Sequence, residues 1–70
     1  MKTFVLCHNL IGMAQATILN SPEKYMPVEC EEIAYQLQIL IANFHHNGEL
    51  TDYQFEKLHS YAESISTMCN

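Results

Sequence analysis

Glu56 and His59 are the residues in this sequence whose spacing comes closest to a catalytic or metal-binding pattern. Residues three apart lie on one side of a helix, and ferritin-like bundles bind two iron ions with Glu-x-x-His pairs. Asp52 and Glu63 extend the same side of the helix by four residues in each direction. A complete site needs two such pairs, so a homodimer would have to supply the second, with extra ligands such as Glu32 or Glu63. That metal-binding, di-iron-like assembly is one hypothesis, but we expect a solvated helix face here and no bound metal.

The remaining histidines do not form a catalytic group with their neighbours. His45 and His46 are adjacent, so on a helix their side chains diverge by about 100° and do not face one ion. We expect them to interact with the negative end of the helix that they terminate. Cys7 and His8 are also adjacent, and Cys7 lies on an apolar stripe where an inert, buried thiol is expected. We therefore predict no catalytic residues, no cofactor and no enzymatic activity.

The composition indicates a small acidic domain with a sparsely charged surface. The chain has 70 residues, of which 49% are hydrophobic and 16% charged, with 3 Lys or Arg against 8 Asp or Glu and a net charge of −5. So few cations do not neutralise the phosphates that nucleic-acid binders contact, which excludes direct DNA or RNA binding. The acidity favours a protein partner with an electropositive surface. Because so short a chain buries little apolar area, we also expect a homo-oligomer.

The cysteines and the N-terminal segment bear on the cellular location. Cys7, Cys30 and Cys69 are odd in number and widely spaced, without a Cys-x-x-Cys pair. This fits neither a disulfide framework nor a zinc site, so we expect free thiols in a reducing cytoplasm. The segment 1–16 resembles a signal peptide, but His8 and Asn9 interrupt its apolar stretch. The same two polar residues also make this segment unsuitable as a membrane-spanning helix, because such a helix needs about 20 apolar residues.

We predict an all-α fold, because apolar residues recur at three- and four-residue intervals along most of the chain. The predicted helices span about residues 3–20, 27–46 and 52–67 of a single domain, residues 1–70. Their apolar stripes are Phe4, Cys7, Ile11, Ala14 and Ile18 in the first helix, Cys30, Ile33, Leu37, Leu40 and Phe44 in the second, and Phe55, Leu58, Ala62, Ile65 and Cys69 in the third. A strand over residues 3–7 is the alternative for the N-terminal segment.

The boundary before the third helix carries the most specific local signal. Thr51 and Gln54 form a capping-box pattern, and Leu50 with Phe55 forms the matching hydrophobic staple. Only residues 47–51 connect the second and third helices, so we expect these helices to form an antiparallel hairpin.

Four residues are the predicted contacts with a partner: Tyr25, Met26, Tyr35 and Ile39. The last two lie away from the central stripe of their helix, and aromatic residues and Met are enriched at interface hot spots. We expect a non-catalytic, dimeric module that docks on a larger protein and inhibits or modulates it, similar in size and composition to phage or mobile-element inhibitors. An antitoxin-like regulator is a further alternative, weakened by the lack of basic residues.

Overall fold

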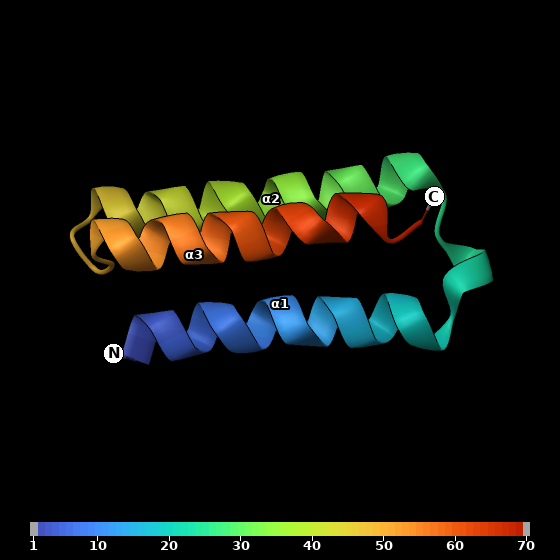
Figure 1. Cartoon of the computed structure of the whole chain (residues 1–70), viewed down its shortest axis with the longest axis horizontal. Helices are drawn as coiled ribbons and strands as arrows, with labels where there is room; N and C mark the ends of the chain where they lie inside the picture. The colour runs from blue at the N-terminus through green and yellow to red at the C-terminus, as the bar shows by residue number, and fades with distance from the viewer. Residues whose placement is uncertain (1, 70) are drawn as a thin grey trace.

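A computed structural model describes residues 2–69 of the chain. It contains three α-helices: α1 (Lys2–Asn20), α2 (Pro27–His46) and α3 (Asp52–Glu63). A short 3-10 helix, η1 (Pro22–Lys24), connects α1 to α2, and a second, η2 (Ser64–Thr67), follows α3. Residues 2–69 contain no strand, so the all-α prediction is confirmed and the strand alternative for residues 3–7 is wrong. The long axis of the molecule measures 37 Å, and all three helices run along it (Figure 1).

The core is apolar and draws on every helix. Its buried side chains are Cys7, Ile11 and Ile18 of α1, Cys30, Ala34 and Ile41 of α2, and Leu50, Leu58, Ala62 and Ile65 from the second half of the chain. These residues follow the three- and four-residue spacing of their helices, which places them on one face. No polar side chain is buried among residues 2–69, so polar contacts between helices lie at the rim of the core.

Local hydrogen bonds define the connection between α2 and α3. Gly48 has φ +80°, and the amides of Gly48 and Glu49 donate to the carbonyls of His45 and Phe44 at 3.0 and 2.9 Å. This is the Schellman arrangement, which uses glycine because a side chain strains the left-handed backbone. The predicted capping box at Thr51 is confirmed. The Gln54 amide donates to Thr51 Oγ1 at 3.1 Å, and the Thr51 amide donates to the Gln54 side chain at 3.0 Å.

The third helix is shorter as an α-helix than the sequence pattern indicates. Regular α-helix ends at Glu63, and residues Ser64–Thr67 continue as the tighter 3-10 helix. The hydroxyls of Ser64, Ser66 and Thr67 each donate to the backbone carbonyl three residues earlier, at 2.6 to 2.9 Å. Such side-chain bonds compete with the backbone bonds of a regular helix, which accounts for its earlier end.

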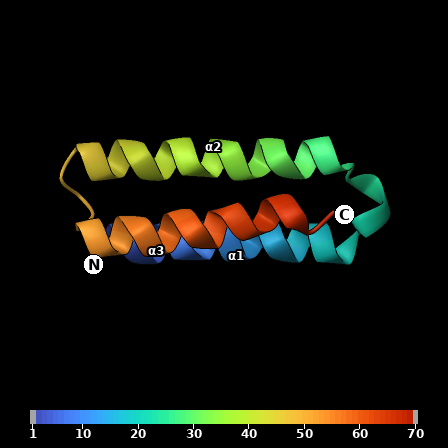
Figure 2. The ribbon, with the colours of Figure 1, turned by 45° about the horizontal axis from the view of Figure 1, so that its top comes forward.

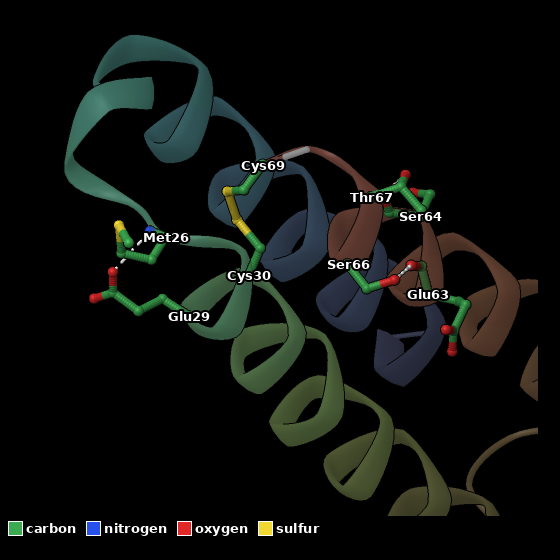
Figure 3. The surroundings of a disulfide bond; sticks show 8 residues. All are labelled: Met26, Glu29, Cys30, Glu63, Ser64, Ser66, Thr67 and Cys69. Atoms are coloured by element: carbon green, nitrogen blue, oxygen red, sulfur yellow. Dashed lines mark hydrogen bonds between the residues drawn. A yellow bond between two sulfur atoms is a disulfide. The ribbon is translucent and has the colours of Figure 1, made fainter.

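The structure corrects the expectation of three free thiols. Cys30, in the first turn of α2, forms a disulfide with Cys69, just after η2, with their Cα atoms 6.2 Å apart (Figure 3). The two residues are 39 positions apart, but α2 and η2 pack against each other and bring them together. Cys7 is the third cysteine, buried and unpaired. An odd number of cysteines is therefore compatible with one bridge and one core thiol.

Candidate functional site

Of the four candidate metal ligands on α3, Asp52 and Glu63 contact side chains of α2, whereas Glu56 and His59 are exposed. Asp52 Oδ1 lies 2.8 Å from His45 Nε2, and Glu63 accepts a hydrogen bond from the side chain of Gln38. The His45 ring also stacks on Phe55, with ring centroids 4.3 Å apart. Within residues 2–69, no three His, Cys, Asp or Glu side chains are grouped closely enough to hold a metal ion. The acidic side of α3 thus forms a polar seam beside the core.

Cys7 and His8 point in different directions. Cys7 is buried in the core, whereas the exposed His8 stacks on Tyr61 of α3, with ring centroids 5.1 Å apart. Burial raises the pKa of the Cys7 thiol, and the negative charge of Glu49 raises it further. The thiol therefore keeps its proton at neutral pH, whereas a nucleophilic cysteine needs a lowered pKa.

Between α1 and α2 lies an apolar groove, with a volume of about 420 Å³. Its floor and walls come from half-buried residues of both helices, namely Leu10, Ala14, Ile33, Leu37 and Leu40. Glu32 and Gln36 form its polar edge, where the Gln36 amide donates to Glu32 Oε1 at 2.9 Å. The groove lies where α1 and α2 meet away from α3, which contacts both of them: α3 runs along α2 in Figure 1 and in front of α1 in Figure 2.

Two exposed residues extend this groove along α1. Leu6 is 50% exposed and Met13 is 65% exposed, and with Leu10 they follow the four- and three-residue spacing of one helix side. We call the groove together with Leu6 and Met13 the α1–α2 face. The sequence pattern did not predict this face, because Ile33, Leu37 and Leu40 were all assigned to the central apolar stripe of their helix, which was expected to be buried. The excess of apolar residues flanking the stripe of α1 was the available signal.

A second apolar surface lies on the other side of α2. Tyr35 is 58% exposed and Ile39 is 39% exposed, one helical turn apart. Val28, also exposed, falls on the same side by its seven-residue spacing from Tyr35. We call Val28, Tyr35 and Ile39 the α2 outer stripe. Glu32, Gln36 and Asn43 lie between this stripe and the groove by the same helical geometry, so the two surfaces are distinct.

The four predicted partner contacts do not form one cluster. Tyr35 and Ile39 are brought together, whereas Met26 is exposed at the start of α2, about 13 Å along the helix axis from Tyr35. Tyr25 is half-buried and packs against the core. Only Tyr35 and Ile39 of the four predicted contacts therefore share one surface, the α2 outer stripe. Their role in binding stays a prediction.

Charge is distributed unevenly over the helices. All eight acidic residues lie between residues 23 and 63, and α1 carries a single charged residue, Lys2. Three of the acids, Glu29, Glu31 and Glu32, lie in the first two turns of α2. No helix among residues 2–69 combines the length and the apolar character that crossing a membrane requires.

Comparison of the chain with protein-family models, with curated proteins and with solved structures gives no match. The function is therefore argued from the surfaces just described.

Proposed function

We propose that this chain is a non-catalytic protein-binding module that docks on a larger protein through the α2 outer stripe and acts as a homodimer. The observation that carries the partner-binding part is the pair Tyr35 and Ile39, which lie one turn apart and remain exposed in the folded chain. Aromatic and large aliphatic side chains in such pairs supply much of the energy of known interfaces. Within residues 2–69, neither side chain makes a hydrogen bond or belongs to the hydrophobic core.

The acidic residues beside this stripe indicate the chemistry of the partner. Glu31 and Glu32 lie on the turns next to Tyr35, and the chain as a whole carries a charge of −5. A partner surface with an apolar pocket surrounded by Lys or Arg would complement both features, because opposite potentials accelerate association and disfavour wrong partners.

Rigid support for the stripe is the second element of the proposal. We take α2 and α3 as an antiparallel hairpin, held by the polar seam between His45 and Asp52 and by the disulfide at the opposite end. A preformed surface binds with less loss of conformational entropy than a flexible one, which favours a function in recognition.

The test compares partner capture by matched variants. Immobilised wild-type protein, a Tyr35→Ala/Ile39→Ala variant and a Tyr53→Ala control are exposed to extract from cells that contain the natural partner, and bound proteins are quantified by mass spectrometry. Tyr53 is an exposed tyrosine on α3, so its removal matches the loss of an aromatic ring elsewhere on the surface. A protein retained by the wild type and the control but lost with the double variant supports the proposal. Equal retention by all three proteins, or capture of none, contradicts it.

A further inference from the structure

The helix α1 has far more apolar surface than the fold covers. Of its 19 residues only Lys2 is charged, yet Leu6 and Met13, each one turn from the groove residue Leu10, are at least half exposed. A surface helix normally carries charged residues opposite its core stripe, and a helix that is apolar on several sides is normally buried. Its outer side therefore has the composition of an interface.

We infer that the α1–α2 face is the surface through which two copies of this chain associate. This inference rests on the homodimer part of the proposed function and specifies where the copies meet. In a two-fold contact the same face is used twice, so Leu6 and Met13 of each copy pack into the groove between α1 and α2 of the other.

The charge distribution selects a second copy as the occupant. Each chain carries −5, and its acids all follow residue 22, so most of the surface of one copy repels another. The helix α1 is the exception, because it contains no carboxylate. Contact through α1 therefore limits the juxtaposition of acids between the copies to Glu32, the one acid on the α1–α2 face, which lies at the polar edge of the groove. A basic partner, in contrast, would gain little from docking on the least acidic helix.

The dimensions of the molecule are sufficient for such a contact. The bundle measures 37 Å by 18 Å by 14 Å, so one long side offers about 670 Å² in projection. Stable interfaces bury about 800 Å² of accessible surface on each partner, and a ridged helical surface has more accessible area than its projection. The two copies must then meet along most of their length, which is the extent of α1.

Sedimentation velocity on the purified, oxidised chain tests the inference. Wild-type protein is compared with Leu6→Glu/Met13→Glu, which places two acids on the α1–α2 face. The matched control is Leu19→Glu/Tyr53→Glu, which introduces the same charges at exposed hydrophobic positions outside both that face and the α2 outer stripe. We expect a wild-type dimer of twice 8.1 kDa at micromolar concentration. Because both copies carry the substitutions, four anchors are lost, and at about tenfold for each the Leu6/Met13 variant should associate about 10,000-fold more weakly, whereas the control should behave as the wild type.

Salt provides a second measurement that needs no substitution. If two chains of like charge meet through a mainly apolar face that holds Glu32 but no cation to pair with it, raising the salt concentration from 50 to 500 mM screens their repulsion and strengthens the dimer. Weaker association at high salt would mean that ion pairs hold the contact and would overturn the inference. If circular dichroism shows that the double-glutamate variant is unfolded, Leu6→Asn/Met13→Asn replaces it.

The outcomes separate the parts of the argument. A wild-type chain that stays monomeric overturns both the homodimer and the inferred face but leaves partner capture through Tyr35 and Ile39 as it stands. A wild-type dimer that the Leu6/Met13 variant leaves intact overturns the inferred face alone. A dimer that only the Leu19/Tyr53 control disrupts would overturn the inferred face and move the contact to another side of the molecule.

Discussion

Reduction of the Cys30–Cys69 disulfide should remove a large part of the stability of this chain. The bridge joins residues 39 positions apart, so it closes a loop that contains α2 from Cys30 onward and all of α3. By restricting the unfolded chain, a bridge that closes a loop of that length raises the free energy of unfolding by about 4 kcal/mol at 25 °C. A 70-residue domain has a total stability of about 4–10 kcal/mol. Loss of the bridge is therefore expected to leave the fold marginal.

Urea denaturation with and without a thiol reductant measures this effect. With an m-value of about 1–2 kcal/mol per molar urea, the free-energy loss lowers the unfolding midpoint by roughly 2–4 M. The control is Cys30→Ala/Cys69→Ala, which should unfold near the reduced wild-type midpoint and should not respond to the reductant.

Two results would refute the reasoning about the bridge. Thiol titration of unfolded, unreduced protein should find one thiol for each chain, from Cys7, and a count of three would mean that no bridge forms. Equal wild-type midpoints in oxidising and reducing buffer would mean that the loop closure does not stabilise the fold. The thiol count in protein recovered from cells also tests the predicted cytoplasmic location, because disulfides persist mainly in oxidising compartments.

Three further substitutions test local features of the fold. Thr51→Ala removes the acceptor for the Gln54 amide and should cost about 1 kcal/mol in a denaturant titration, whereas Thr51→Ser should keep most of it; an unchanged midpoint would mean that the cap contributes nothing. Because burial raises the pKa of Cys7, the unfolded thiol ionises first as the pH rises above about 8.5, so stability is complete below that pH and declines above it. Cys7→Ala should show a shallower decline between pH 8 and 10 than the wild type, and parallel curves would contradict this. Glu56→Gln/His59→Gln changes two exposed side chains and should alter stability by no more than about 0.5 kcal/mol, with no metal bound to wild-type protein. Elemental analysis that finds one metal per chain or per dimer would instead favour the metal-binding hypothesis.

Periodicity and capping residues were sufficient to predict the helices. The spacing of Cys30, Ala34 and Ile41 defines the buried side of α2, and Pro27 begins that helix where its fixed φ is compatible with a first turn. Thr51 and Gln54 mark the start of α3 because both side chains bond backbone groups within four residues. These signals are local, so no knowledge of the rest of the fold was needed to use them.

Features that depend on how the helices pack could not be predicted in the same way. Periodicity shows which side of α2 is apolar, but the extent to which α1 covers Ile33, Leu37 and Leu40 depends on the separation of the two helices. The pairing of Cys30 with Cys69 depends on the alignment of α2 with η2, which distance along the sequence does not reveal. Helical geometry placed Tyr35 and Ile39 away from the central stripe, but whether the first helix covers them depends on packing; the structure leaves them exposed, and their binding role awaits the capture experiment.

The position of the disulfide also determines how the molecule responds to mechanical force. When the chain is pulled by its two ends, tension passes through the bond between Cys30 and Cys69, so the segment between them carries no load. Only the residues before Cys30 extend freely, and 29 residues at about 3.4 Å each give about 100 Å of contour length. After reduction the whole chain extends, to more than twice that length. The bridge thus divides the chain into a shielded segment that holds most of α2 and all of α3, and an N-terminal segment with α1 and η1 that yields under load.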